Sequence, residues 1–575
     1  MKRYWKYIRP YIQYYILGPC FMMMEVVGDV LLPYMLAKII NQGIAERNVV
    51  YIIKIGVIMG FIAVIMAVGG VLGAWFASKA AMNFGADLRM DLFEKIQQFS
   101  FQNIDNFSTG SLITRLTNDI TQIQNMIMMT LRMCLRSPGI LIGAMVMAFV
   151  ISPKLAAIFI IVLPVLAVLI VVIMRRAFPQ FRTLQEKLDA LNSCIQEGLV
   201  GIRLIKSFVR GDYEEMRFEK RNQQLKEANL TAMKTMLLYT PLTTLALNIT
   251  TVVVVWSGGN MIVAGNMQVG DLTAFTNYIV QIMSSLTMLS IAFLNWARAI
   301  ASFRRVGEVL NEKIDLTDEN AKHKDRAVCE GSVEFQNVSF RYYKNSPEWV
   351  IENISFKLEA GKTLGIIGPT GSGKSTLVSM IPRLYDTDEG TVLVDGINVR
   401  DYGLKPLREG IGMVLQNNTL FSGSITENLK WGDEHADEKA VRKAAQNAQA
   451  AGFIDSFKDG YRTRLEQSGN NVSGGQKQRL CIARALLKCP KILILDDSTS
   501  AVDTATERAI REALHSEYKD MTKIIIAQRI RSVMDADEIL VLDNGKTAGF
   551  GTHEQLLADC PVYREIYDVQ NGREE

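Results

Sequence analysis

The 575-residue sequence has little cysteine, little histidine and almost no excess charge, and each shortage removes a class of function. None of the seven cysteines forms a C-x-x-C pair, and no cysteine–histidine cluster has zinc-site spacing, so neither a disulfide framework nor a zinc site is expected. The formal net charge of +4 gives no support to a nucleic-acid partner. The thiols are therefore expected to be reduced, in a cytosolic or membrane setting.

Apolar residues are plentiful. They make up 49% of the chain and charged residues 21%, which is apolar for a soluble protein and polar for a pure membrane protein. A chain of 575 residues also exceeds what one hydrophobic core accommodates. The composition predicts a membrane half joined to a soluble half.

Six stretches are candidates for membrane-spanning helices, which need about 20 apolar residues because backbone groups in lipid must be paired internally. Four candidates contain uncharged stretches, at residues 55–78, 155–174, 235–270 and 272–297. The first and third candidates include charged residues. We expect spans near 14–40, 52–79, 126–153, 155–175, 235–264 and 271–297.

Basic residues set the expected orientation. Lys2, Arg3, Lys6 and Arg9 precede the first span in a basic and aromatic segment that reads as an interfacial helix rather than a signal peptide. Further basic residues follow the second, fourth and sixth spans, so both termini are predicted to be cytoplasmic. The cytoplasmic connections at about 79–130 and 175–234 have helical periodicity, and either form plain linker helices or reach the soluble half.

Two carboxylates, Glu25 and Asp29, are four residues apart inside the first expected span and so share one helix face. Such residues are costly in a membrane. They either line a cavity or gate, or pair with a nearby Arg or Lys or lie in a water-filled vestibule. The 27 methionines either form an adaptable drug-binding wall or simply pack.

A polar linker at 311–330 precedes residues 331–575, where short β-rich runs alternate with helices as in α/β folds. The strand-like run 363–367 leads into a complete G-x-x-x-x-G-K-[ST] motif followed by a helix-like run. Its backbone N–H groups are expected to wrap ATP phosphates, with Lys374 at the β- and γ-phosphates and Ser375 on Mg²⁺. The expected phosphate-binding residues are Gly368, Pro369, Thr370, Gly371, Ser372, Gly373, Lys374, Ser375 and Thr376.

The run KILILDD at 491–497 reads as a buried strand that ends in carboxylates. Such a strand is the expected companion of the phosphate loop, and it places Asp496 near the Mg²⁺ ion. The cofactors predicted are therefore ATP and Mg²⁺.

The run 471–476, which contains Ser473, Gly474, Gly475 and Gln476, resembles the signature of ATP-binding cassette (ABC) proteins. Three further pieces fall in that family's order. Tyr342 resembles its adenine-stacking aromatic, Gln416 its Q-loop glutamine that bridges Mg²⁺ and the membrane domain, and Ser500 to Asp503 its D-loop.

Two segments of the first half also resemble ABC exporters. Residues 106–119 resemble their first intracellular loop and residues 208–218 the second. The resemblance implies an α-helical six-span transmembrane domain with long cytoplasmic extensions, fused to an α/β P-loop nucleotide-binding domain. It also implies that ATP is gripped between the phosphate loop of one subunit and the signature of another.

The sequence departs from the family pattern around the expected γ-phosphate. Asp497 stands where the family usually has its glutamate general base, and aspartate is one methylene shorter. Gln528 stands where the family has its switch histidine, and glutamine cannot carry charge. Gln467, shortly before the signature, replaces a frequent glutamate.

An intact signature beside two altered residues predicts an asymmetric pair, as in the degenerate-site subunit of bacterial heterodimeric multidrug exporters. The expected partner is a second half-transporter that carries the glutamate and the histidine, in the bacterial cytoplasmic membrane, with hydrophobic or amphipathic compounds as cargo. Two alternatives stay open: an ATP-binding gating or regulatory subunit, and a homodimeric lipid or peptide exporter.

Overall fold

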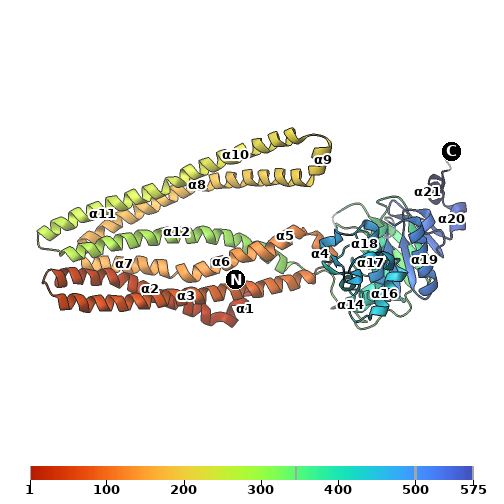
Figure 1. Cartoon of the computed structure of the whole chain (residues 1–575), viewed down its shortest axis with the longest axis horizontal. Helices are drawn as coiled ribbons and strands as arrows, with labels where there is room; N and C mark the ends of the chain where they lie inside the picture. Colours follow the sequence, from red (N-terminus) through yellow and green to blue (C-terminus); the bar gives the residue numbers. More distant parts are fainter. Residues whose placement is uncertain (1, 344–345, 498–501, 573–575) are drawn as a thin grey trace. The chain divides into compact units, whose positions relative to one another are not determined.

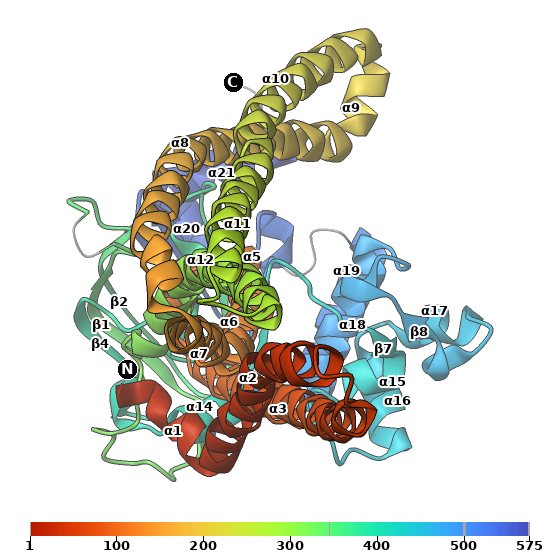
Figure 2. The ribbon, with the colours of Figure 1, turned by 90° about the vertical axis from the view of Figure 1, so that its left-hand side faces the viewer.

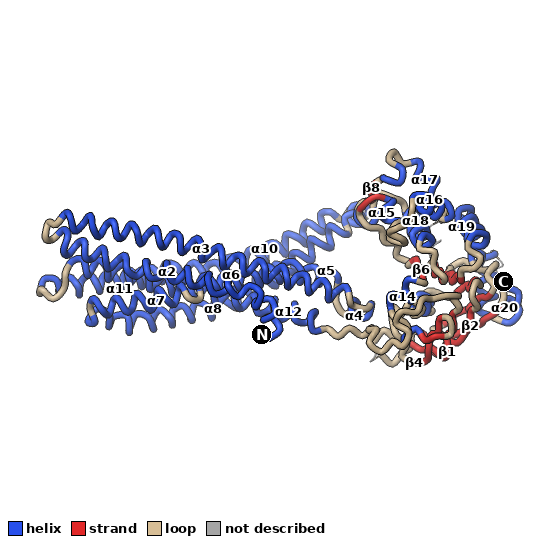
Figure 3. The backbone as a smooth tube through the Cα atoms, turned by 90° about the horizontal axis from the view of Figure 1, so that it is seen from below, coloured by secondary structure: helices blue, strands red, loops and turns tan. Residues whose placement is uncertain are grey.

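The computed structural model describes residues 2–343, 346–497 and 502–572, and the chain folds as two units. The first unit comprises residues 1–96 and 110–311, and the second comprises residues 97–109 and 312–575. Long helices build the first unit, and every strand among the described residues belongs to the second (Figure 3).

The first unit consists of helices joined by short turns (Figure 1). They are α1 (Trp5–Ile8), α2 (Ile12–Lys38), α3 (Val49–Gln97), α5 (Thr109–Thr114), α6 (Ile120–Met133), α7 (Arg136–Ile151), α8 (Pro153–Val200), α9 (Ile202–Ser207), α10 (Gly211–Leu237), α11 (Tyr239–Val263) and α12 (Val269–Asn311).

Five described helical stretches are long and apolar enough to cross a membrane: Trp5–Ile44, Val49–Gln97, Thr109–Ile151, Pro153–Val200 and Gly211–Val263. Each overlaps one of the first five expected spans, and the third and fifth expected spans run one or two residues past the end of their stretch. The sixth expected span lies in α12, which is 43 residues long but is not one of these five stretches. The chain is therefore a membrane protein with at least five apolar helices, and the count of six stays a prediction.

Two of the helices extend far beyond the length of a membrane span. Helix α3 has 49 residues and α8 has 48, whereas about 20 residues cross a bilayer. Helix α8 runs beside α10, and the short helix α9 joins them at the tip of the hairpin (Figures 1 and 2). The helical periodicity expected for both connections is thus confirmed.

The second unit holds the remaining helices and all twelve labelled strands. The helices are α4 (Phe101–Asp105), α13 (Lys374–Ser379), α14 (Leu404–Glu409), α15 (Ile425–Leu429), α16 (Glu438–Asn447), α17 (Ala451–Ser456), α18 (Gly474–Leu487), α19 (Thr504–Glu517), α20 (His553–Asp559) and α21 (Pro561–Asn571). The strands are β1 (Val333–Phe340), β2 (Ile351–Leu358), β3 (Thr363–Ile367), β4 (Glu389–Val394), β5 (Ile397–Asn398), β6 (Ile411–Val414), β7 (Gly423–Ser424), β8 (Arg464–Leu465), β9 (Ile492–Asp496), β10 (Thr522–Ile526), β11 (Glu538–Asp543) and β12 (Lys546–Gly551).

The main sheet has the strand order β12-β11-β3-β10-β9-β6, with parallel pairing from β11 to β6 and an antiparallel β12 at one edge. A parallel sheet covered on both faces requires almost continuous apolar strands, and all five residues of β9 and of β10 are buried. A second sheet, β2-β1-β4-β5, shares an apolar cluster with the main sheet. The carboxyl ends of β3, β9 and β10 therefore meet at one edge of the main sheet.

The short helix α4 packs with the second unit, although its sequence neighbours on both sides belong to the first. Ser100 and Asn103 form a capping box at its start, and the amide of Asn103 donates to the carbonyl oxygen of Lys313 at 2.9 Å. Asp105 accepts a hydrogen bond of 3.0 Å from the hydroxyl of Tyr385. The residues just before the segment that resembles the first exporter loop are thus anchored on the second unit, which also includes the first four residues of that segment, 106–109.

Candidate functional site

The phosphate loop connects the end of β3 to the start of α13 and depends on two glycines. Gly371 and Gly373 have φ angles of +87° and +90°, a region that favours glycine. A Cβ atom on Gly373 would also lie 2.6 Å from Cγ2 of Ile351. The loop can therefore turn its backbone N–H groups toward one point only with glycine at these positions.

Lys374 lies across this loop. Its ammonium donates to the carbonyl oxygens of Gly368 and Pro369 at 2.9 and 2.7 Å. Burial lowers the pKa of Lys374, and the nearby carboxylates of Asp496 and Asp497 oppose that shift. A desolvated ammonium beside a ring of N–H donors is suited to the β- and γ-phosphates of ATP.

Ser375 and Asp496 supply two oxygen ligands next to the loop. The Ser375 hydroxyl donates to the Asp496 carboxylate at 2.9 Å, and burial raises the pKa of that carboxyl. No cluster of three or more His, Cys, Asp or Glu side chains suited to a metal occurs in the described residues. A hydroxyl and one carboxylate fit Mg²⁺, which typically takes its remaining ligands from water and nucleotide phosphates. When bound, Mg²⁺ would neutralise phosphate charge. Gln416, the other residue expected near Mg²⁺, lies exposed after β6.

Tyr342 stands at the outer side of the phosphate loop. Its hydroxyl lies 2.8 Å from Oγ1 of Thr376, and its ring packs edge-on against Phe340 and Tyr385, with centroids 5.1 and 5.3 Å apart. The ring remains 37% exposed, so an aromatic face stays accessible for a base to stack upon.

The two altered residues, Asp497 and Gln528, contact each other directly. The Gln528 amide donates to Oδ2 of Asp497 at 2.7 Å, at the carboxyl ends of β9 and β10. Burial raises the pKa of Asp497, and the bond from Gln528 partly offsets the shift. A carboxylate whose oxygen already accepts from an amide, on a side chain shorter than glutamate, is poorly placed to take a proton from water.

The signature residues begin α18. The Ser473 hydroxyl accepts from the backbone N–H of Gln476 at 3.3 Å, while the Gln476 side chain accepts from the Ser473 N–H at 2.9 Å. This capping box leaves the first N–H groups of the helix, at Gly474 and Gly475, directed outward. A 14-residue helix with such an end is a suitable anion cradle.

The D-loop positions Ser500 and Ala501 lie outside the described residues. Asp503 is described and caps α19, where its carboxylate accepts from the N–H of Thr506 at 3.0 Å. That bond lowers the pKa of Asp503.

The sequence did not reveal a link between the signature helix and the altered carboxylate. The side chain of Gln478, 3% exposed, donates to the backbone carbonyl oxygen of Asp497 at 3.3 Å. Its position in the first turns of a helix with a buried face is the signal that could have identified it. The helix that begins with the signature is thus joined to the residue that follows β9.

Glu25 and Asp29 lie in the first unit and share one partner. The guanidinium of Arg136, at the start of α7, lies 2.9 Å from the Glu25 carboxylate and 3.3 Å from the Asp29 carboxylate. The predicted pairing with an arginine is therefore present. The signal in the sequence was that Arg136, like the two carboxylates, is a charged residue in a candidate membrane span.

Comparison with known proteins agrees with this geometry. Residues 15–286 match the model of the ABC transporter transmembrane region, and residues 351–500 match the ABC transporter model. The chain is 39% identical to the ABC transporter ATP-binding protein YfiB of Bacillus subtilis, over 100% of this chain and 99% of YfiB.

Two further similarities concern function and fold. The putative multidrug export ATP-binding/permease protein YgaD of Bacillus subtilis is 33% identical, over 99% of each chain. A solved bacterial Atm1-family ABC exporter with ATP bound superposes with a TM-score of 0.81 at 24% identity, covering 98% of each chain, and shows the fold. The chain belongs to the ATP-binding cassette transporters and is an exporter-type half-transporter, with a helical membrane domain fused to an ATP-binding ATPase domain.

Proposed function

We propose that this half-transporter works as one subunit of a heterodimer that exports hydrophobic or amphipathic compounds. Its own phosphate loop, with Asp497 and Gln528, builds a slow ATP site together with Mg²⁺. Its signature, Ser473 to Gln476, completes a competent site on a partner that supplies a glutamate base and a switch histidine.

The observation that carries the proposal is the hydrogen bond between Gln528 and Asp497. It brings both departures from the family pattern to one point, whereas the signature keeps its capping box. A homodimer would repeat the altered site twice, so a mixed pair accounts better for an intact signature.

The hairpin tip of α8, α9 and α10 supports a protein partner. Leu199, Val200, Leu204, Phe208 and Val209 are each more than 60% exposed there. Val209 also has a φ of +52°, an unusual conformation for a β-branched residue. A cluster of exposed apolar side chains with local strain typically marks an interaction site.

The membrane setting follows the same reasoning. The basic residues near Lys6 and Arg9 favour cytoplasmic termini, and we place the pump in the bacterial cytoplasmic membrane. The named role of YgaD in multidrug export supports a broad apolar cargo for this chain.

Turnover by the purified chain tests the proposal. The chain alone in lipid nanodiscs should hydrolyse ATP slowly, and coexpression with a glutamate- and histidine-bearing half-transporter should raise turnover by about 100-fold. Asp497→Asn should change the rate of the mixed pair by less than about threefold. Full turnover by the chain alone, abolished by Asp497→Asn, would show instead that Asp497 is a working base in a homodimer.

A gating or regulatory role is the second candidate, and the restrained Asp497 favours it because binding without hydrolysis would suffice. Vesicles that hold the mixed pair separate the two roles. Cargo flux that stops with a non-hydrolysable ATP analogue supports the pump, whereas flux sustained by that analogue supports the gate.

A further inference from the structure

A lysine interrupts the buried strand β10. Lys523 is only 5% exposed, and it pairs along the backbone with Thr363 of β3 and Leu493 of β9, in the interior of the main sheet. An ammonium taken out of water destabilises a fold unless it finds anionic partners.

No hydrogen bond or ion pair to the Lys523 ammonium occurs within the described part of the chain. Asp537 and Asp520 act on it only electrostatically from further away. Burial therefore outweighs them and lowers the pKa of Lys523. Within the described part of the chain, the ammonium is thus balanced only by carboxylates beyond ion-pair distance.

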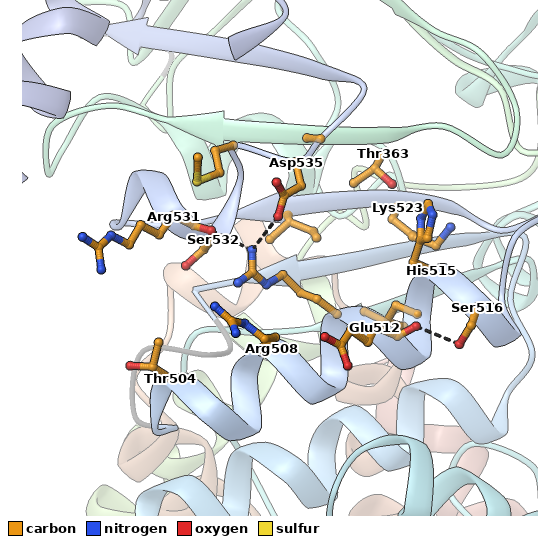
Figure 4. Close-up of a pocket in the computed structure, with 15 residues that line it drawn as sticks. Thr363, Thr504, Arg508, Glu512, His515, Ser516, Lys523, Arg531, Ser532 and Asp535 are labelled. Carbon is orange, nitrogen blue, oxygen red and sulfur yellow. Dashed lines mark hydrogen bonds and ion pairs between the residues drawn. The ribbon is translucent and has the colours of Figure 1, made fainter. Parts of the chain in front are cut away.

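Lys523 lines a cavity of about 1010 Å³ between α19, the starts of β3 and β10, and the segment after β10 (Figure 4). The phosphate loop follows the carboxyl end of β3, whereas this cavity reaches Thr363 at its amino end. The two sites therefore lie at different ends of one strand. The volume suits a molecule of metabolite size.

Basic side chains exceed acidic ones in this cavity. Arg508, Arg511 and Arg531 join Lys523, whereas Glu512 and Asp535 are the acidic lining residues. The lining thus carries a formal excess of two positive charges with His515 neutral, which attracts an anion.

Arg511 also lines the cavity and is held in place by two contacts. Its NH1 donates to the carbonyl oxygen of Arg531 at 2.6 Å and lies 3.5 Å from the Asp535 carboxylate (Figure 4). Its Nε is buried and has no hydrogen-bond partner among the described residues. Arg508 lies beside it, exposed on α19 (Figure 4). Arg511 and Arg508 thus add guanidinium donors to the Lys523 ammonium.

We propose that this cavity is a second anion site, which binds a phosphate-bearing small molecule independently of the phosphate loop. A guanidinium fork and an ammonium match the several acceptor oxygens of a phosphate group. Hydroxyls of Thr363 and Ser532 supply further donors, and Leu514, Ile525 and Met534 form an apolar side. Because α19 begins directly after Asp503, the ligand would contact the helix that carries the D-loop aspartate.

The test is a calorimetric titration in which inorganic pyrophosphate is added to the full chain in the absence of Mg²⁺. The chain is held in nanodiscs, together with its partner subunit if it forms a heterodimer. All proteins carry Lys374→Met, which removes the ammonium of the phosphate loop. In this background, Lys523→Met and Arg508→Gln should each weaken pyrophosphate binding about tenfold or more. Lys546→Met is the matched control, because that exposed lysine pairs with Glu352, and it should change nothing.

Two results would overturn the proposal. One is that the Lys374→Met protein binds no more pyrophosphate than the partner subunit does by itself. The other is that adding Lys523→Met leaves pyrophosphate binding unchanged. Without Lys374→Met, Lys523→Met should leave ATP affinity within about twofold, because the phosphate loop is intact.

Thermal unfolding separates a binding role from a structural one. Lys523→Met should raise the unfolding temperature without added anion, because methionine fills the space without a buried charge. Pyrophosphate should then stabilise the chain with Lys523 but not the variant. A lower unfolding temperature for Lys523→Met, unaffected by pyrophosphate in either protein, would show a structural lysine. Arg508→Gln, on an exposed helix face, keeps the binding test available if Lys523→Met does not fold.

Discussion

The second unit contains two regions suited to binding phosphate, the phosphate loop with its neighbouring residues and the signature. They differ in how closely their residues follow the family pattern. At the phosphate-loop end, Lys374, Ser375 and Asp496 are arranged to hold MgATP, but Asp497 is engaged by the Gln528 amide. At the signature end, Ser473 and Gln476 cap a long helix whose first N–H groups stay available. One chain thus combines an end suited to binding with an end suited to helping catalysis elsewhere.

Under the proposed pairing, the two ends serve different ATP molecules. In the ABC arrangement implied by the resemblance, a signature acts on nucleotide held by the other subunit. If the proposed pairing holds, damage to the signature of this chain should stop the partner's site, whereas damage near Asp497 should affect only the site proposed to be slow.

The largest effect is expected from Gly475→Asp in the mixed pair. A carboxylate at the start of α18 would repel the γ-phosphate and replace outward N–H donation, so turnover should fall by about 100- to 1,000-fold. Steady-state ATPase in nanodiscs measures this. Gly452→Asp, in an open position on α17, is the control. Turnover unchanged by Gly475→Asp would mean that this signature serves no active site.

A repaired phosphate-loop end should gain activity. Asp497→Glu combined with Gln528→His restores a longer carboxylate and a chargeable side chain, and should raise hydrolysis by the chain alone by about 100-fold. ATPase assays of the double variant and both single variants measure this. Each single variant should gain much less, because the two residues contact each other. No gain in the double variant would place the defect elsewhere.

Lys374→Met tests the binding role of the same end. Loss of one charge-assisted contact should weaken ATP binding to this chain by about tenfold, as measured with a fluorescent ATP analogue. Turnover of the mixed pair should fall far less than with Gly475→Asp. A fall as deep as that of Gly475→Asp would remove the proposed asymmetry.

Asp497→Asn should have a small effect on stability. Burial raises the pKa of this carboxyl, so the folded state binds the proton more readily than the unfolded state, and stability decreases as pH rises through the raised pKa. Asparagine avoids that loss and should raise the unfolding temperature by about 1–3 °C at pH 7. The gain should shrink as pH falls toward the ordinary aspartate value of 3.8.

Asp503→Ala should change the unfolding temperature in the opposite direction in the same experiment. Its carboxylate caps α19, and its pKa is lowered by the Thr506 N–H, so the variant should unfold at a lower temperature near pH 7. Equal responses of the two variants to pH would contradict the burial argument for Asp497.

Much of the fold could be predicted because its signals are local. The run at 363–367 forms β3 and is followed directly by the phosphate loop, and the strand expected before Asp496 is β9. Apolar length predicted five spans that overlap the five long apolar helical stretches of the described chain. The sixth expected span, 271–297, lies within α12 and stays a prediction, because α12 is not one of the five long apolar stretches.

The sequence by itself determined the chemistry of the phosphate loop and the signature, because a few adjacent residues set the backbone and the donors of each. Only the tertiary structure decided which distant groups meet: Gln528 with Asp497, Gln478 with the carbonyl of Asp497, and Arg136 with Glu25 and Asp29. It also decided that Lys523 is buried with no hydrogen bond or close ion pair to its ammonium among the described residues, since the cost of burying a charge depends on every neighbour that packing brings near it.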